Sequence, residues 1–401
     1  MRTALTERLG IELPIIQAPM GGAVGPRMAA AVSNAGGLGM LVPWRAKPET
    51  VRQQIRETRA LTSRPFGVNL VIEFPQEERL AVCLEEHVPI ISFFWGDPSS
   101  LTQRAKTAGA VVLHTVGSAA EAKRAVDAGV DIIVAQGWEA GGHVRGTVAT
   151  LPLVPAVVDA VAPVPVVAAG GIADGRGLAA VLALGAAGAW IGTRFLACEE
   201  AMIHPRYRER LLAAHETDTV YLKDLFDVRW PNAPHRTLRN RTVEAWEAAG
   251  CPPSGKRPGE GEVIATSRSA GPVVRYQSYT PGPDAEGDID ALSLWAGQGV
   301  GLVSKVQSAG DIVLRSLRKG GRPCSDLGVE RLFQISRRRI VAGINRLDQE
   351  FRGVVMPELT DLVIGCEDRV HEPAVAPLHL ADMHVENGRA VFVEVDGADR
   401  S

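Results

Sequence analysis

A histidine that follows two glycines is the residue of this sequence best placed to move a proton. It ends the run Gln136-Gly-Trp-Glu-Ala-Gly-Gly-His143. A neutral imidazole takes a proton from a substrate carbon near physiological pH, and the preceding glycines leave room for a flat ligand above the loop. The run therefore predicts His143 as a catalytic base. The alternative is a histidine that only hydrogen-bonds its own loop.

Two other polar side chains in the same run could assist the histidine. Glu139 lies four residues before it and is predicted either as a second acid–base group or as a brace of the loop. The amide of Gln136 offers both donors and an acceptor, which suits the edge of a ring that carries N–H and C=O groups. A buried glutamine that is satisfied by the backbone is the alternative for Gln136.

Two glycine-containing turns further along the chain predict a phosphate site. They are Ala169-Gly-Gly-Ile172 and Ile191-Gly-Thr-Arg194. Glycine lets backbone N–H groups approach a phosphate closely, and the hydroxyl of Thr193 adds a donor. A tight turn without a ligand would explain either loop alone. The occurrence of both, one after each of the last two predicted strands, favours the phosphate.

Other reaction classes lack their motifs in this chain. The sequence has no Ser-His-Asp order of loop ends, no HExxH pair and no Walker A lysine. Cys198 follows the last predicted strand, where a buried structural thiol competes with a nucleophilic role. The tail histidines His371, His379 and His384 are irregularly spaced, so we predict no metal site.

These residues can act together only if the elements that precede them bring them to one place. Eight short apolar runs alternate with Ala-rich amphipathic segments, and the runs are nearly continuous in apolar residues, as in strands buried on both faces. The alternation predicts parallel strands joined through helices. The count of eight favours a (β/α)8 TIM barrel, an α/β fold, over an open doubly wound sheet, and places the active site at the carboxyl ends of the strands. The runs are Pro14–Met20, Leu38–Val42, Phe66–Ile72, Pro89–Trp95, Ala110–Val116, Asp131–Gly137, Pro165–Gly171 and Ala187–Phe195.

The regular plan stops after Phe195. Residues 204–290 are rich in Arg, Pro, His and Gly, and we predict a helical insertion, of the kind that forms a lid, before the last barrel helix. We therefore predict a cofactor-binding barrel over residues 1–319 and a C-terminal extension of unknown role over 320–401. The barrel should end with a final helix at Ala309–Arg318. In the extension we expect an amphipathic stretch at Glu330–Phe351 and a hairpin of Leu378–Val385 and Arg389–Val395 around Asn387-Gly388.

The bulk composition restricts the setting and the partners. The 401 residues carry a net charge of −3, with no block of like charge, so we predict neither a nucleic acid nor a membrane partner. Five scattered cysteines without a CxxC pair indicate a reducing compartment. The N-terminus has no signal-peptide pattern, and no apolar run is long enough to span a bilayer. A cytoplasmic location is expected, and a homo-oligomer is compatible with the sequence.

Several separated motifs, in this order along the chain, resemble the nitronate monooxygenase family, formerly called 2-nitropropane dioxygenase. The resemblance covers roughly residues 1–318. Its motifs are Pro14-Ile-Ile-Gln-Ala-Pro-Met20, Asn69, the Gln136–His143 run, Ala168-Ala-Gly-Gly-Ile-Ala-Asp-Gly175, Gly192-Thr-Arg-Phe195 and Ala296-Gly-Gln-Gly299.

The resemblance implies a flavoprotein that oxidises alkyl nitronates or nitroalkanes with O₂ and uses FMN as its cofactor. In such an oxidoreductase His143 would abstract the α-proton of a neutral nitroalkane or hold the nitronate anion. The residues that the resemblance places against FMN are Met20, Asn69, Gln136, Gly141 and Gly171, with Trp190, Gly192 and Thr193 at the phosphate and ribityl end.

Two departures from the family pattern leave alternatives open. Many members carry Gln where this chain has Trp190, so that contact would be made by the backbone alone. The loop after the histidine reads Val144-Arg-Gly146, one residue longer than usual, which would shift the substrate pocket. An FMN-dependent enoyl-acyl carrier protein reductase and an NADH:quinone reductase of the same superfamily remain alternatives, as does a flavin-binding protein without turnover.

Overall fold

Eight parallel strands form the ring that the sequence predicts. In the computed structural model they pair in the order β1-β9-β8-β6-β5-β4-β3-β2, and a parallel bridge between Ile16 and Leu38 joins the two end strands. The (β/α)8 TIM barrel is therefore confirmed. Its strands are β1 (Ile15–Gln17), β2 (Gly39–Leu41), β3 (Phe66–Val71), β4 (Ile90–Phe94), β5 (Val111–Val116), β6 (Ile132–Gln136), β8 (Val166–Ala169) and β9 (Gly188–Ile191).

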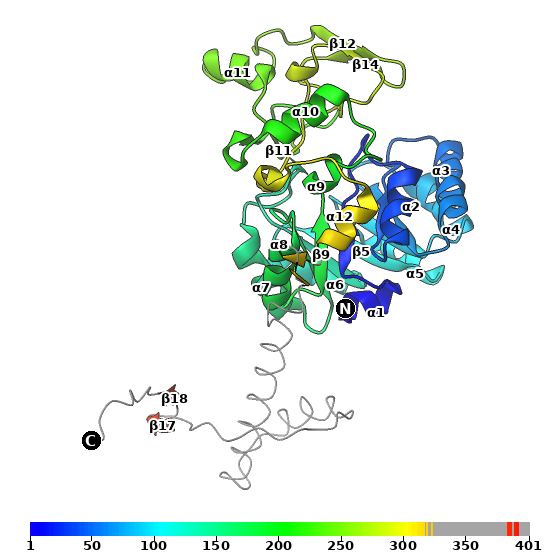
Figure 1. The fold of residues 1–401 in the computed structure, drawn as a ribbon, viewed down its shortest axis with the longest axis vertical. Helices are drawn as coiled ribbons and strands as arrows, with labels where there is room; N and C mark the ends of the chain where they lie inside the picture. Colours follow the sequence, from blue (N-terminus) through cyan, green and yellow to red (C-terminus); the bar gives the residue numbers. More distant parts are fainter. Residues whose placement is uncertain (317, 320–321, 324–382, 387–388, 393–401) are drawn as a thin grey trace. The chain divides into compact units, whose positions relative to one another are not determined.

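The structure describes residues 1–316 and the short strand segments 318–319, 322–323, 383–386 and 389–392. Contacts divide the chain into two units, Met1–Phe333 and Gln334–Ser401. The first unit holds the barrel and the insertion, and Figure 1 shows the insertion over one end of the barrel. The division of function between 1–319 and 320–401 stays a prediction.

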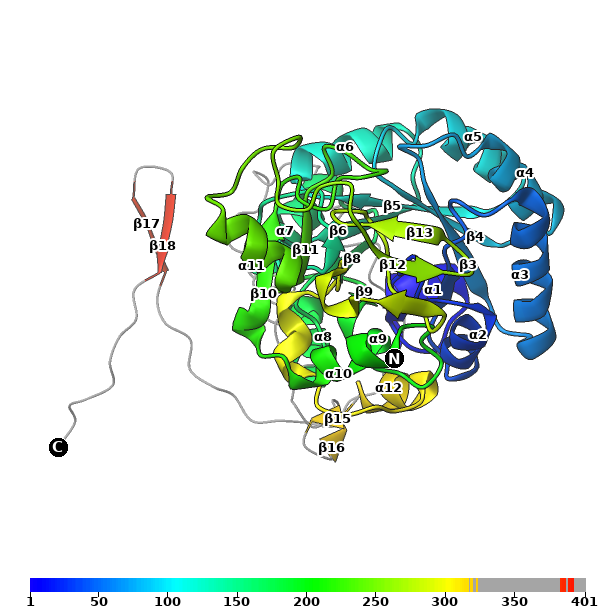
Figure 2. The same ribbon diagram turned by 90° about the horizontal axis from the view of Figure 1, so that it is seen from above.

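Helices cover the outside of the barrel (Figure 2). Polar side chains cap two of them at the start: Ser118 accepts a hydrogen bond from the backbone N–H of Glu121, and Asp174 from that of Arg176. The last predicted strand was too long, since β9 ends at Ile191 and a short helix follows. The helices are α2 (Pro26–Asn34), α3 (Pro48–Leu61), α4 (Glu77–Glu85), α5 (Ser99–Thr107), α6 (Ala119–Asp127), α7 (Thr150–Val161), α8 (Gly175–Ala183), α9 (Thr193–Leu196) and α12 (Ala309–Arg315).

The interior of the barrel is a packed apolar core. Alternate residues of each strand point inward or outward, so Ile132 and Val134 of β6 join the inner core while Ile133 and Ala135 pack against the helices. Helix α1 (Ala4–Leu9) adds Leu5 to the inner core. Burial on both faces explains why the strands read as continuous apolar runs.

The insertion contains helices, as predicted, but also two antiparallel sheets, so the prediction of a helical insertion was incomplete. One sheet, β10-β11-β7, includes a strand that lies between β6 and α7 of the barrel; the other has the order β13-β12-β14. Strands of three to five residues are too short for period-two alternation to reveal them. The elements are α10 (Pro205–Ala213), η1 (Glu216–Asp218), β10 (Thr219–Leu222), β11 (His235–Leu238), α11 (Arg241–Ala248), β12 (Val263–Ser267), β13 (Gly271–Val274), β14 (Ala285–Gly287) and η2 (Ile289–Ala291), with β7 (Gly142–His143) before the insertion and η3 (Gln298–Leu302) after it.

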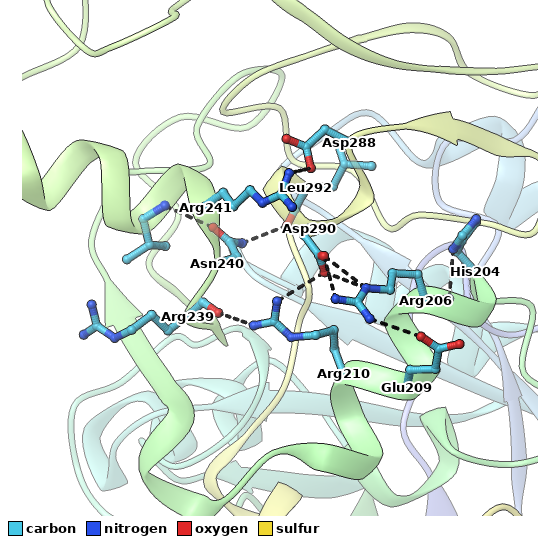
Figure 3. A network of polar contacts seen from close by, with 11 residues as sticks. His204, Arg206, Glu209, Arg210, Arg239, Asn240, Arg241, Asp288, Asp290 and Leu292 are labelled. Carbon is cyan, nitrogen blue, oxygen red and sulfur yellow. Dashed lines mark hydrogen bonds and ion pairs between the residues drawn. The ribbon is translucent and has the colours of Figure 1, made fainter.

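A polar network joins distant parts of the insertion (Figure 3). Asp290 of η2 pairs with two arginines of α10, Arg206 at 2.8 Å and Arg210 at 3.2 Å. Asn240 caps α11 through the backbone N–H of Val243 and donates to the carbonyl of Leu292 at 2.8 Å. The Asp290 side chain is only 12% exposed, so these contacts fix the segments more firmly than exposed ion pairs would.

The tail contains the predicted hairpin in part. Strands β17 (Met383–Glu386) and β18 (Arg389–Phe392) pair antiparallel with Glu386 opposite Arg389, which leaves the two residues 387 and 388 between them. Two-residue strands β15 (Arg318–Lys319) and β16 (Arg322–Pro323) also pair. The predicted stretch Glu330–Phe351 lies outside the described residues.

Candidate active site

A cavity of about 460 Å³ opens at the carboxyl ends of the barrel strands. Barrel loops and the insertion both line it. All nine site residues predicted from the sequence lie on its wall: Met20, Asn69, Gln136, Gly141, His143, Gly171, Trp190, Gly192 and Thr193. The structure thus brings residues from five strand ends to one place, as the fold requires.

His143 sits where the barrel meets the insertion. It belongs to β7 and pairs with His235 of β11, while the next residue, Val144, donates to the carbonyl of Pro234 at 2.8 Å. The Val144 side chain is buried, so the residue that lengthens this loop is part of the junction. The insertion therefore helps to position the loop that carries His143.

Aromatic rings surround the imidazole of His143. It stacks on Trp230, with centroids 3.9 Å apart and planes 26° apart, and the rings of Trp295 and Trp95 lie 5.4 Å and 6.2 Å away. Trp95 and Arg229, the residue before Trp230, have φ values of 66° and 74°. Bulky residues rarely adopt this left-handed backbone, and such strain tends to collect at functional sites.

Burial favours the neutral form of the His143 imidazole, and one of its nitrogens has no partner. Burial lowers its pKa well below the usual value, and the nearby His235 and Arg45 lower it further. Its Nε2 is buried and has no hydrogen-bond partner. In the tautomer that carries its proton on Nδ1, this nitrogen would be available to accept a proton from a ligand.

Gln136 holds the catalytic loop. Its Nε2 donates to the carbonyl of His143, and its Oε1 accepts from the backbone N–H of Arg145, both at 3.1 Å. The side chain also lines the cavity and retains a second N–H. The backbone therefore binds this amide, as the alternative interpretation expected, and one donor is left over, while contact with a ring stays a prediction.

Glu139 is a brace rather than a second acid–base group. Its carboxylate accepts from the backbone N–H of Thr150 at 2.9 Å and from the Thr150 hydroxyl at 3.0 Å. Thr150 is the first residue of α7, where a negative charge is favourable. The same hydroxyl reaches the carbonyl of Gly170 at 3.1 Å, so Glu139 ties the histidine loop to the neighbouring glycine loop.

Asn69 presents a buried acceptor to the cavity. Along β3, Val68 and Leu70 pack outward against the helices, so the residue between them faces the inside of the barrel. Asn69 is 2% exposed, and its Oδ1 has no hydrogen-bond partner. An unpaired buried carbonyl is costly, which is the mark expected of a group that meets the N–H of a bound ring.

The two glycine loops supply backbone to the cavity. Gly170 and Gly171 have φ values of 105° and 69°, conformations that glycine adopts without penalty. The hydroxyl of Thr193 accepts from the N–H of Gly297 at 3.0 Å, which leaves its own proton free for a phosphate. Trp190 packs its ring in the inner core of the barrel and is 7% exposed.

A buried arginine supports the histidine loop from the insertion side, a contact that the sequence did not reveal. Arg236 of β11 donates to the carbonyl of Trp138 at 3.0 Å and lies over the Trp138 ring at 4.6 Å. Burial lowers its pKa, while Glu139 acts in the opposite direction. The aromatic wall around His143 was also missed, because Trp230 lies in an irregular stretch without periodicity.

The other candidate chemistries find no support in the described residues. Burial raises the pKa of Cys198 to about 12, and its side chain belongs to the apolar core, so this thiol is structural. Within the described part of the chain, no group of three or more His, Cys, Asp or Glu is placed to hold a metal ion; His371 and His379 lie outside it. No helix there is long and apolar enough to cross a membrane.

Comparisons with known proteins agree with this architecture. Residues 2–78 and 71–318 match the family model described as nitronate monooxygenase. A protein of Rhodococcus jostii named (3aS,4S,5R,7aS)-5-hydroxy-7a-methyl-1-oxo-octahydro-1H-indene-4-carboxyl-CoA dehydrogenase is 40% identical over 251 residues, 62% of this chain and 69% of the relative. A nitronate monooxygenase of Paraburkholderia phytofirmans is 34% identical over 77% of this chain and 92% of its own. The structure of FabK from Thermotoga maritima superimposes with a TM-score of 0.67 at 35% identity, over 79% of this chain and 95% of that one.

Proposed function

Because the chain belongs to the nitronate monooxygenase family, as the resemblance of its motifs predicts, we propose that it is an FMN-dependent oxidoreductase that oxidises alkyl nitronates and nitroalkanes with O₂. The observation that carries the proposal is the free, buried Nε2 of His143 on the wall of a cavity that also holds all eight predicted cofactor residues.

The residues of the cavity fit FMN. The unpaired Oδ1 of Asn69 and the remaining donor of Gln136 match the polar edge of a flavin ring. Gly171, Gly192 and Thr193 supply backbone and a hydroxyl for its phosphate, while Met20, Gly141 and Trp190 would line the rest. FMN would accept electrons from the substrate and pass them to O₂.

The protein's own contribution is to move the proton and to exclude water. With its pKa lowered by burial, His143 stays neutral and accepts the α-proton of a neutral nitroalkane at Nε2. The rings of Trp230, Trp295 and Trp95 around it keep the site apolar, which strengthens polar interactions within it. A nitronate anion needs no proton transfer and would be bound directly.

A second candidate is oxidation or reduction of a coenzyme A thioester. It is favoured by the 40% identity to a relative named as a carboxyl-CoA dehydrogenase, which exceeds the 34% identity to the relative named nitronate monooxygenase. The cavity offers the same imidazole nitrogen without a partner to either reaction.

The test is a visible spectrum of the purified protein followed by oxygen uptake with propionate-3-nitronate. The expected result is a yellow protein, or one reconstituted with FMN, that consumes O₂ only when the nitronate is added. A protein that cannot bind FMN would overturn both candidates. Rapid bleaching by NADH together with consumption of a crotonyl-type thioester, without nitronate-dependent uptake, would replace the first candidate with an enoyl reductase activity.

A further inference from the structure

Two arginines lie beside the cavity without acidic partners. Nη2 of Arg45, in the loop after β2, donates to the backbone carbonyl of Arg229 in the insertion at 2.8 Å. Neither guanidinium makes an ion pair within the described residues, whereas the neighbouring Arg145 pairs with Glu121 at 3.1 Å. Burial and the charge of Arg229 lower the pKa of Arg45. Both residues are exposed, so solvent screens the repulsion between these two like charges, and neither has an acidic partner within the described residues.

The cavity contains one charge and no opposite charge. Among the described residues that line it, Arg45 is the only one of the types Arg, Lys, Asp and Glu. Its guanidinium lies over the ring of Trp44 at 4.1 Å and over that of Phe74 at 5.2 Å. Stacking holds a guanidinium in place while its edge stays open to a ligand.

An aromatic wall connects this charge to the imidazole. The ring centroids of Trp44 and Trp230 are 5.2 Å apart, and the ring of Trp230 stacks on that of His143 with centroids 3.9 Å apart. A ligand that reacts at His143 would cross these apolar rings before it reached Arg45. The wall therefore selects a molecule with a reacting carbon at one end, an apolar segment, and a negative group at the other end.

We propose that Arg45, assisted by Arg229, forms an anion subsite of this cavity that binds a carboxylate or a phosphate of the substrate. The assignment rests on the proposed function only in taking His143 as the reacting end. Guanidinium groups recognise both anions through paired N–H donors, so the shared chemistry is an organic anion whose charge lies away from the reacting carbon.

The first test compares ligands that differ in one carboxylate. The protein used is the holoprotein with His143→Ala, in which turnover is suppressed. It is titrated with 3-nitropropionate and with 1-nitropropane. Tryptophan fluorescence reports binding, because Trp44 and Trp230 line the cavity. Adding Arg45→Met should weaken 3-nitropropionate about tenfold, as expected for a lost charged hydrogen bond, and leave 1-nitropropane within about twofold. Arg45→Lys should weaken the binding of 3-nitropropionate by less than Arg45→Met does, because lysine keeps the positive charge but lacks the paired N–H donors of a guanidinium.

The matched control is Lys47→Met. It removes the same charge from the same loop, but Lys47 does not line the cavity, so both ligands should bind as before. A second pair, crotonyl-coenzyme A and crotonyl-N-acetylcysteamine, differs in phosphates instead. If Arg45→Met weakens the binding of crotonyl-coenzyme A but not that of crotonyl-N-acetylcysteamine, the anion is a phosphate. If it weakens only 3-nitropropionate of the first pair, the anion is a carboxylate.

Three results would overturn the subsite. Equal weakening of charged and neutral ligands would mean that Arg45 only positions Arg229 and Trp230. Loss of flavin from Arg45→Met would assign the guanidinium to the cofactor. Unchanged binding of both pairs would mean that no subsite exists. Because binding is measured without turnover, failure of nitronate oxidation in the wild-type protein leaves this test readable.

Discussion

The barrel and the insertion enclose one cavity, but they build it from different parts of the chain. The barrel presents backbone at Gly171 and Gly192 and one buried amide at Asn69. The insertion presents side chains, above all the ring of Trp230 and the strained residue before it, Arg229. A cofactor of fixed shape suits the first kind of surface, and substrates that differ among relatives suit the second.

This difference makes a prediction about variants. Changes on the barrel side should act on flavin affinity, and changes on the insertion side should act on the substrate. His143 is the junction of the two, since it follows a barrel strand and pairs with β11 of the insertion. The three experiments below test the division, from the largest expected effect to the smallest.

The largest effect is expected at the junction. His143→Ala should retain the yellow cofactor but lose about 10²–10⁴-fold of its activity on neutral nitroalkanes, the usual contribution of a general base. Activity on the pre-formed nitronate should fall less, because its proton is already gone. Steady-state oxygen uptake with each substrate measures this, and His87→Asn, at an exposed position, is the control. Equal losses on both substrates would mean that His143 binds charge instead of moving protons.

An intermediate effect is expected on the free energy of unfolding at acid pH. The barrel and the insertion each contribute one buried histidine to this effect. Burial lowers the pKa of His114, in β5, and of His235, in β11, to about 4. The ring of His235 contacts the Ala233 carbonyl through Nδ1 at 2.9 Å and accepts from the Phe226 N–H at Nε2, which requires the neutral form. The unfolded chain takes up a proton below about pH 6.5 and the folded chain does not.

Stability should therefore be constant above about pH 6.5 and fall between pH 6.5 and 4. Each histidine contributes about 1.4 kcal/mol per pH unit to that fall. Urea unfolding at pH 7 and pH 5 measures it, and His114→Gln and His235→Gln should each reduce the difference between the two pH values. If one variant leaves the difference unchanged, that histidine titrates normally in the folded protein.

The smallest effect is expected in the glycine loop of the barrel. Gly171→Ala forces a side chain into left-handed backbone, and the new Cβ would meet only the Cβ of Glu139 at 3.7 Å. The strain is about 1 kcal/mol. A free loop that relaxes to relieve this strain must be restored when FMN binds, so FMN affinity should fall by roughly tenfold or less. Gly250→Ala, with a φ of 81° and open space around it, carries the same strain far from the loop and should leave the FMN titration unchanged. Equal loss of flavin in both variants would contradict a cofactor role for Gly171.

The barrel could be predicted from the sequence because its rules are local. Continuous apolar runs and the Ala-rich amphipathic segments between them are patterns of a few neighbouring residues, and together they located eight strands and the helices that join them. The insertion escaped the same reasoning, since strands such as Ala285–Gly287 are too short to show a period. The candidate site followed the same division. The glycine loops and His143 were found at strand ends, and Trp230 and Arg45 were not.

The sequence by itself determined the barrel, the order of its strand ends and hence the set of residues that share one cavity, because parallel strands must place their carboxyl ends on one side. Only the tertiary structure decided what those residues do there. It turned Glu139 into a cap of α7, occupied part of Gln136 with loop backbone, and left the Nε2 of His143 free between aromatic rings. The first two outcomes are hydrogen bonds within one loop, whose geometry the residue types alone do not fix. The third depends on contacts between His143 and residues about 90 positions away, such as Trp230, and spacing along the chain carries no record of such contacts.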